Sequence, residues 1–139
     1  MQVRIYIQSG SKNPRRMMRK YGYVLECTIE DEEVTREGFG KTEATYHGTC
    51  VFALEQAMKR LKNNQSELLI YCEDAWMLTQ LQDSLGTWAK QDFLNAKGKP
   101  IADQKAWLHV WLMAEGHDIQ TAAGRHKYSA WMLQEMGKK

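Results

Sequence analysis

The sequence predicts an α/β domain built on a five-stranded mixed β-sheet that is packed by helices. Three observations carry this prediction. Stretches with an apolar residue at every second position come first, a spacing of three to four residues replaces them near residue 47, and helical and strand patterns then alternate to the end of the chain. A meander of three strands followed by such alternation places antiparallel and parallel neighbours in one sheet, so the order βββαβααβα indicates a mixed sheet.

The first part of the chain carries the three consecutive strands. Apolar residues occupy alternate positions from Val3 to Ile7, and the polar residue Gln8 follows at the strand end. Asn13-Pro14 is a turn signal inside a polar loop. Two glycines weaken the third strand, because glycine has no side chain to pack. The predicted segments are strands over Val3–Ser9, Tyr21–Ile29 and Val34–Thr45 and a loop over Ser11–Lys20.

The second part of the chain alternates between helix and strand. Val51, Leu54, Met58 and Leu61 lie three or four residues apart, as on one face of a helix. Glu67–Cys72 is a short apolar stretch, which is typical of a strand buried on both faces. The further predicted segments are helices over 47–64, over 73–88 with a break near Gly86, over 104–116 and over 126–136, and a last strand over 118–123.

The composition is that of an ordinary globular protein, and we predict a single domain over residues 1–139. Hydrophobic residues make up 43% and charged residues 26% of the chain, and a net charge of +2 means that any nucleic-acid-binding surface must be local. The three cysteines have no zinc-site spacing, and their odd number favours a reducing cytoplasm. No apolar stretch approaches the ~20 residues of a membrane span. The first residues have no signal-peptide pattern. We therefore expect a cytoplasmic protein without a membrane partner.

Several apolar side chains are predicted to be buried. Trp76, Trp111 and Trp131 stand on predicted helices among apolar residues, so we expect them in the core. Cys50 and Cys72 are predicted to be small buried residues, because free cysteines are commonly buried and inert.

The element order, together with several motifs, resembles the ribonuclease H type 1 family. The resemblance runs from Gln2 to about Met132 and includes a first strand with an Asn-Pro loop and the helix segment "ALEQAMKRL". It is strongest over residues 73–107, where "YCEDAWM", Trp88, Phe93 and "GKPIADQKAW" occur in the register of the family. The resemblance implies a ribonuclease H-like fold, with a three-strand meander, two further strands and helices on both faces of the sheet.

The resemblance also implies where catalytic groups should stand. The family hydrolyses the RNA strand of an RNA–DNA hybrid with two Mg²⁺ ions, which need about four carboxylates. Glu73 is the only carboxylate at a corresponding position, and the neighbouring Asp74 is a weak additional metal candidate. The resemblance therefore implies a catalytically degenerate member that holds no metal. The other positions are occupied by Gln8 at the end of the first strand, by Cys50 or Tyr46 in the first helix, and by Ser129, Ala130 or Trp131 at the start of the last helix.

Three alternatives qualify this chemistry. Asp74 could instead cap the helix that follows it. A rebuilt active site would use Mg²⁺ or Mn²⁺ and would draw on Glu43, Glu55 or Asp118. Some family members have a histidine in a flexible loop, and His126 is the nearest candidate here.

Two basic segments suggest that nucleic-acid binding survives, with an RNA–DNA hybrid or another duplex as the partner. Lysine and arginine side chains supply salt-sensitive affinity for phosphate. The second segment surrounds Trp88 and corresponds to a lysine- and tryptophan-bearing protrusion of some family members. Trp88 and Trp107 are expected to pack in the core or in this protrusion rather than to contact bases. A protein-interaction or assembly module is the remaining alternative, and a protein partner is possible. The predicted nucleic-acid-binding residues are Lys12, Asn13, Arg15 and Arg16 in the first segment and Trp88, Lys90, Lys97 and Lys99 in the second.

Overall fold

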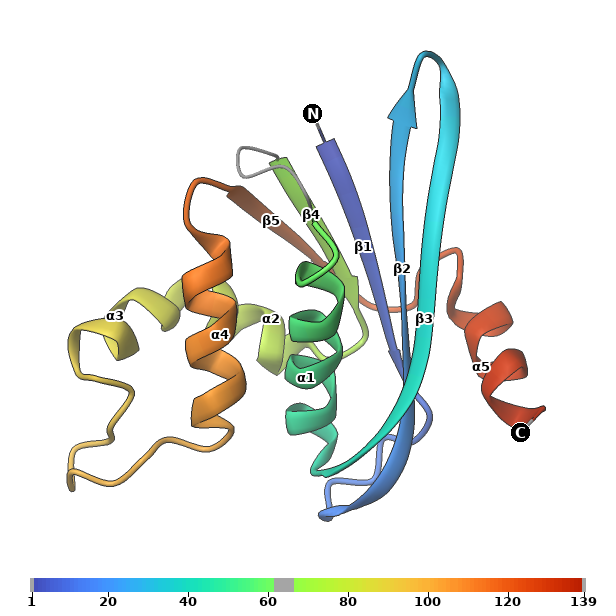
Figure 1. The fold of residues 1–139 in the computed structure, drawn as a ribbon. Helices are drawn as coiled ribbons and strands as arrows, with labels where there is room; N and C mark the ends of the chain where they lie inside the picture. Colours follow the sequence, from blue (N-terminus) through green and yellow to red (C-terminus); the bar gives the residue numbers. More distant parts are fainter. Residues whose placement is uncertain (1, 62–66, 139) are drawn as a thin grey trace.

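A five-stranded mixed sheet forms the centre of the computed structural model, which describes residues 2–61 and 67–138 (Figure 1). The strands are β1 (Gln2–Ser9), β2 (Met17–Ile29), β3 (Glu32–Ala44), β4 (Glu67–Cys72) and β5 (Asp118–Ala123). Their order across the sheet is β3-β2-β1-β4-β5. The pairs β1–β2 and β2–β3 are antiparallel, and the pairs β1–β4 and β4–β5 are parallel. The predicted mixed sheet, with its meander of three strands, is therefore confirmed.

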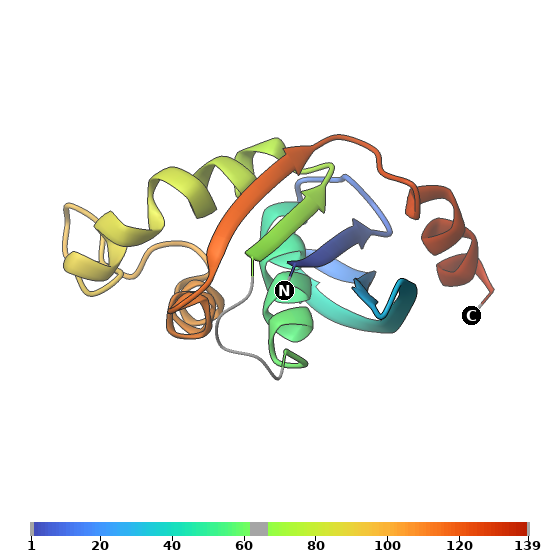
Figure 2. The ribbon, with the colours of Figure 1, turned by 90° about the horizontal axis from the view of Figure 1, so that it is seen from above.

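The helices cover both faces of this sheet, as predicted. They are α1 (Tyr46–Met58), α2 (Ala75–Asp83), α3 (Leu85–Lys90), α4 (Gln104–Ala114) and α5 (Ser129–Gly137). Helices α1 and α4 pack together on one face of the sheet, and α5 lies against β1 and β2 on the other face (Figure 2). Among the described residues, no helix is long and apolar enough to cross a membrane.

The alternation along β1 explains why the sheet has a core on each face. Ile5 and Ile7 are fully buried in the larger cluster, together with Leu54 of α1. Tyr6, between them in sequence, belongs to a smaller cluster with Met132 of α5. Because successive side chains of a strand point to opposite faces, one apolar strand can pack against both layers.

Strand β2 begins earlier than the sequence predicts. It starts at Met17 rather than at Tyr21, so the preceding loop ends at Arg16. Arg19 and Lys20, which we placed in a polar loop, pair with β3 in the sheet. Local sequence misses this extension because the pairing with β3, and not an apolar pattern, holds these polar residues in a strand.

Two helix boundaries also differ from the prediction. Helix α1 ends at Met58, with Lys59 as its C-cap, whereas the predicted end near residue 64 lies outside the described residues. The break between α2 and α3 falls at Ser84 instead of Gly86.

The prediction for three tryptophans was wrong. Trp76, Trp111 and Trp131 are 46%, 40% and 37% exposed. By contrast, Trp107 is buried, and its ring centroid lies 5.2 Å from that of Trp88. Helices α2, α4 and α5 each bury only one face, against the sheet or, for α4, against α1 and α3, so apolar neighbours in sequence do not place a side chain in the core.

Candidate functional site

Two polar side chains meet where β1 and β4 end. Because these strands are parallel neighbours, their carboxyl ends lie at the same edge of the sheet, near the start of α1 (Figure 1). Gln8 at the end of β1 is 4% exposed, and its Nε2 donates a hydrogen bond of 2.9 Å to Oε1 of Glu73. The same Nε2 donates to the carbonyl of Ser9 at 3.1 Å. The Oε1 atom of Gln8 is buried and has no hydrogen-bond partner among the described residues.

The second carboxylate oxygen of Glu73 contacts a lysine. The Nζ atom of Lys12 lies 2.7 Å from Oε2 of Glu73; the glutamate side chain is 8% exposed, whereas that of Lys12 is 63% exposed. Burial acts to raise the pKa of Glu73, but hydrogen bonds from Lys12 and Gln8 and the charges of Lys12 and Arg125 outweigh it and hold this pKa below its usual range. Glu73 is therefore an ionised carboxylate whose two oxygens are both engaged within the protein.

Asp74 beside it serves helix α2. Its Oδ1 accepts a hydrogen bond of 3.1 Å from the backbone N–H of Met77, which confirms the predicted N-cap. Its Oδ2 lies 2.6 Å from Nδ1 of His47. The centroid of the His47 imidazole ring in turn lies 4.5 Å from the centroid of the Trp76 ring, and both side chains are partly exposed. This places an aromatic pair at the surface next to the strand-end site.

Helix α1 presents Cys50 and Tyr46 toward the same strand end. They are four residues apart and thus lie on one face of the helix. Cys50 is buried against Cys72, as predicted for both residues; the hydrogen bond to Cys72 and then burial raise the pKa of the Cys50 thiol. Burial, followed by the nearby charges of Cys50, Cys72, Asp74 and Glu73, raises the pKa of Tyr46. Neither residue is a carboxylate, whichever of the two registers is chosen.

The start of α5 lies close to β1. Ser129 is fully buried and its Oγ accepts a hydrogen bond of 3.0 Å from the backbone N–H of His126, whereas Ala130 is exposed. The Nε2 atom of His126 donates to the carbonyl of Ile7 at 3.0 Å. Burial lowers the pKa of this histidine, although the bond to Ile7 opposes the shift. His126 is thus held against β1 rather than projecting from the loop.

The basic loop, which we define as residues 11–16, lies beside this site. Lys12, Asn13, Arg15 and Arg16 are all exposed. The side chain of Asn13 accepts a hydrogen bond of 3.0 Å from the backbone N–H of Arg15, which forms a local turn. Three cations are therefore presented at the surface.

The second basic segment projects away from the sheet (Figure 1). Lys90 ends α3, and Lys97 and Lys99 follow in a tight turn in which both of their backbone N–H groups donate to Oδ1 of Asn95. All three lysines are exposed. The ring of Trp88 packs at the base of this segment, as predicted.

A groove of about 560 Å³ lies between α1 and α4, and none of Trp88, Lys90, Lys97 and Lys99 is among its lining residues. Arg16 borders it on one side and Lys105 on the other. Acidic side chains also line it: Glu43 lies 3.5 Å from Arg16, and Glu55 is buried with its Oε2 at 2.5 Å from Nδ1 of His109. The groove thus has a mixed charge, and its cations lie at the rim.

Comparison with known proteins identifies the fold. No protein-family model matches the sequence, and no curated protein matches it with significant similarity. Solved structures do match. LC9-RNase H1, a type 1 RNase H with the type 2 active-site motif, is 13% identical with a TM-score of 0.69, and the match covers 99% of this chain and 69% of that one. RNase H1 from Halobacterium salinarum is 15% identical with a TM-score of 0.59, and the match covers 98% and 94% of the two chains.

The foamy viral protease-reverse transcriptase matches in two complexes. In the complex with RNA/DNA hybrid the identity is 15% and the TM-score 0.69, over 96% of this chain and 19% of the viral chain. In the complex with dsDNA the identity is 16% and the TM-score 0.70, over 99% and 91% of the two chains. The fold is that of ribonuclease H.

The ribonuclease H-like fold raises the question of whether this chain has the ligands for a metal pair. Mg²⁺ prefers carboxylate oxygens, and a two-metal site requires several of them. Here the strand-end site has Glu73 alone, and its two oxygens accept from Gln8 and Lys12. Across residues 2–61 and 67–138, no group of three His, Cys, Asp or Glu side chains is arranged to hold a metal ion. The residues present do not fit a magnesium pair.

The three acids that a rebuilt site would use lie elsewhere. Glu43 is exposed near Arg16, and Glu55 contacts His109 and Lys59 on the groove side of α1. Asp118 begins β5 opposite Glu67, at the other end of the strand pair from Glu73. The ribonuclease H-like fold of this chain does not bring these acids to Glu73.

One charged cluster was missed in the sequence. Glu26 is fully buried in β2, where Arg4 at 2.5 Å, Lys127 at 2.7 Å and the hydroxyls of Tyr6 and Tyr128 contact its carboxylate. Burial opposes its charge, but Lys127, Tyr128 and Arg4 lower the pKa of Glu26 to about 2. The available signal was a glutamate inside the otherwise apolar stretch "YVLECTI".

Proposed function

We propose that this domain is a non-catalytic module that binds an RNA–DNA hybrid or another nucleic-acid duplex through its backbone phosphates. One observation carries the proposal: the carboxylate of Glu73 at the strand-end site is paired with the charge of Lys12 and accepts a hydrogen bond from Gln8, while exposed cations border the neighbouring groove. A site that has satisfied its own charge has little affinity for Mg²⁺, whereas exposed lysines and arginines attract phosphate.

The type of partner is supported by the related structures. The foamy viral protease-reverse transcriptase, which shares this fold, was solved with an RNA/DNA hybrid and with dsDNA. In the present chain Arg16 of the basic loop and Lys105 of α4 both border one groove. A duplex lying along the groove would contact both of these cations.

The proposal is tested by measuring binding and cleavage on the same sample. We expect a labelled RNA–DNA hybrid to bind at low salt, with an affinity that falls steeply as the salt concentration rises. A double variant, Arg15→Gln with Arg16→Gln, should flatten the salt dependence by a slope of about 2, because two phosphate contacts are lost. Arg36→Gln, which removes an exposed arginine of β3, is the control and should behave as the wild type.

Cleavage decides the catalytic part of the proposal. We expect no hybrid cleavage with Mg²⁺ or Mn²⁺. Cleavage that Glu73→Gln abolishes would contradict the proposal and would establish an active nuclease; cleavage that is indifferent to Glu73→Gln would come from a contaminant. Absence of hybrid and duplex binding at low salt, or binding without salt dependence, would contradict the binding function.

A second candidate function is assembly through α4, and one observation favours it. Leu108, Trp111 and Leu112 form an exposed apolar ridge on this helix. Light scattering on a concentrated sample tests this function. A dimer that Leu112→Glu converts to a monomer would support self-assembly, and a monomeric wild type would contradict it.

A further inference from the structure

Arg19 is a buried arginine whose partners are all backbone carbonyls. It is 4% exposed, and it lies at the start of β2, just after the basic loop. Its Nη1 donates to the carbonyl of Ser11 at 2.7 Å, and its Nη2 donates to the carbonyls of Asn13 and Arg15 at 2.8 and 2.6 Å. Every second carbonyl from Ser11 to Arg15 therefore points inward, toward a single guanidinium group.

This guanidinium has no carboxylate to neutralise it. Within the described part of the chain, Arg19 forms no ion pair, and its Nε is buried without a hydrogen-bond partner. Removing a charge from water is costly unless it is paired, and carbonyl dipoles compensate only in part. Because arginine keeps its proton in proteins, a positive charge lies beneath the loop, in surroundings that screen it less than water does.

The inward carbonyls also determine what the loop shows to solvent. The loop is further held by hydrogen bonds from the backbone N–H groups of Asn13 and Arg15 to the side chains of Ser11 and Asn13. With the carbonyls of Ser11, Asn13 and Arg15 bound and its turns fixed, the loop presents cationic side chains and withdraws three groups that would repel an anion. A pre-organised surface of this kind loses less conformational entropy on binding.

We infer that Arg19 is a positioning residue that shapes residues 11–16 into a surface for the phosphodiester backbone of a nucleic-acid duplex. The inference rests on the proposed function. Arg19 itself does not reach the surface; it holds the carbonyls of Ser11, Asn13 and Arg15 inward so that Lys12, Arg15 and Arg16 face outward together.

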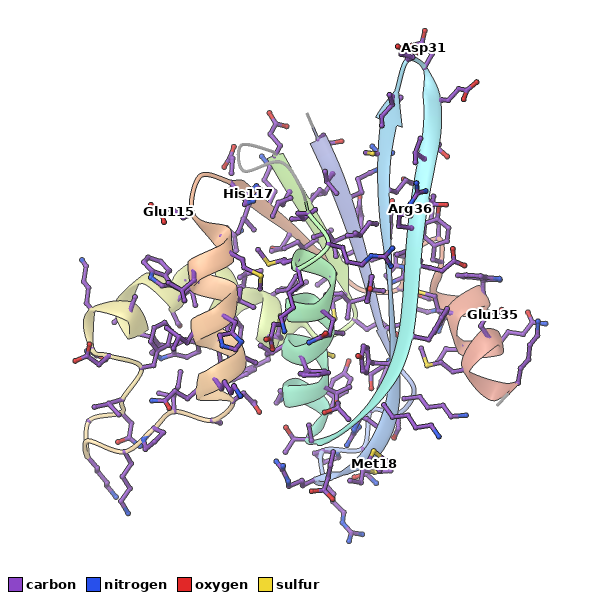
Figure 3. The ribbon with its side chains drawn as sticks, viewed as in Figure 1. Met18, Asp31, Arg36, Glu115, His117 and Glu135 are labelled. Atoms are coloured by element: carbon purple, nitrogen blue, oxygen red, sulfur yellow. The ribbon has the colours of Figure 1, made fainter. Side chains whose placement is uncertain are left out.

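Three variants separate positioning from simple loss of charge. Arg19→Met removes the guanidinium and keeps an unbranched side chain of about the length of the aliphatic part of arginine. Arg19→Lys retains the charge but has a compact head group that cannot serve all three carbonyls in the planar arrangement of arginine. Arg36→Met is the matched control, because Arg36 is an exposed arginine on β3, far along the strand from the Met18 end where the loop joins β2 (Figure 3).

The first measurement is binding of a labelled RNA–DNA hybrid over a series of salt concentrations. For Arg19→Met we expect the slope of log affinity against log salt to fall by about 1 to 2, since each lost phosphate contact removes about 0.9. Arg19→Lys should give an intermediate slope and Arg36→Met the wild-type slope. A residue that only stabilised the fold would lower the melting temperature without changing the slope of the folded protein.

The second measurement is the rate of trypsin cleavage after Arg15 and Arg16, followed by mass spectrometry. In Arg19→Met we expect cleavage to accelerate on the order of tenfold or more, because the loop opens when its charge-assisted hydrogen bonds are lost. Arg36→Met should be cut at the wild-type rate. If Arg19→Met does not fold, Arg19→Lys is judged by the same two measurements.

The outcomes separate the inference from the proposed function. A wild-type protein that binds no hybrid overturns the proposed function, whatever the variants do. If the wild type binds, an Arg19→Met protein with the wild-type slope and cleavage rate overturns the inference alone. A lower melting temperature with an unchanged slope also overturns it, because Arg19 would then only stabilise the fold.

Discussion

Two buried glutamates on the same sheet are neutralised in different ways. Glu26, in the middle of β2, receives its counter-charges from Arg4 of β1 and from Lys127, which directly precedes α5, and two tyrosine hydroxyls also contact it. Glu73, directly after β4, receives from an exposed loop the one cation, Lys12, that forms an ion pair with it among the described residues. The first carboxylate is part of the packing between the sheet and α5, whereas the second lies at an edge of the sheet where an exposed loop supplies its cation.

The largest expected effect is that of Glu26→Gln on stability. The substitution leaves Arg4 and Lys127 without their buried acceptor charge, so we expect the free energy of unfolding to fall by about 3–5 kcal/mol in a urea titration. Glu33→Gln is the control, because Glu33 is exposed and contacts the same two cations weakly, at 3.9 and 4.0 Å. This substitution should lower the free energy of unfolding by less than about 0.5 kcal/mol. Equal effects of the two substitutions would show that the cluster is not part of the core.

Acid should reveal the same cluster. The folded pKa of Glu26, about 2, lies below the ordinary value for glutamate of about 4.3. Its contribution is therefore complete above the ordinary value and is lost as the pH falls through the folded pKa. The stability difference between wild type and Glu26→Gln should shrink from about pH 5 to pH 2 in urea titrations. A difference that stayed constant over this range would contradict the assigned pKa.

Glu73→Gln should have a smaller effect. The carboxylate loses a charge but keeps one accepting oxygen, and the exposed Lys12 can turn to water, so we expect a loss of about 1 kcal/mol by the same titration. A loss as large as that of Glu26→Gln would place the strand-end site in the core and would remove the contrast between the two glutamates.

The smallest effect on stability is expected for Lys12→Met. An exposed ion pair contributes less than about 1 kcal/mol, whereas the hybrid salt slope should fall by about 0.9 if Lys12 contacts one phosphate. Lys127→Met is the matched variant at Glu26; it should destabilise the protein more than Lys12→Met and leave the salt slope unchanged. The opposite order of stability effects would overturn the comparison.

The prediction of elements from sequence succeeded for strands whose apolar residues alternate with polar ones and for strands that are apolar throughout. The alternation through Ile5 and Ile7 and the apolar stretch Glu67–Cys72 both follow from local pattern. It failed at the start of β2, where Arg19 is held by pairing with β3, and at Trp111, where an apolar helix neighbourhood did not imply burial. In both cases a contact distant in sequence decides the outcome.

The candidate site, too, has contacts that could be expected beforehand and contacts that only the structure shows. The resemblance brought Gln8 and Glu73 together, and the structure places them in hydrogen-bond contact. It could not indicate that Lys12 contacts Glu73, nor that Glu26 lies in a cluster of two cations and two tyrosines. Exposed loop residues carry no periodicity from which their partners can be read.

The sequence by itself determined the strand and helix periods and the mixed sheet, because these are properties of residue type and spacing. The missing acids at the positions of a metal pair follow from the resemblance to the ribonuclease H family. Only the tertiary structure decided which charges are internal and which are exposed to solvent. Arg15 and Arg19 are four residues apart and chemically the same, yet one is exposed and the other is buried beneath the loop. The reason is physical: burial depends on strand pairing and on which face of the sheet a side chain meets, and neither is encoded in the side chain itself.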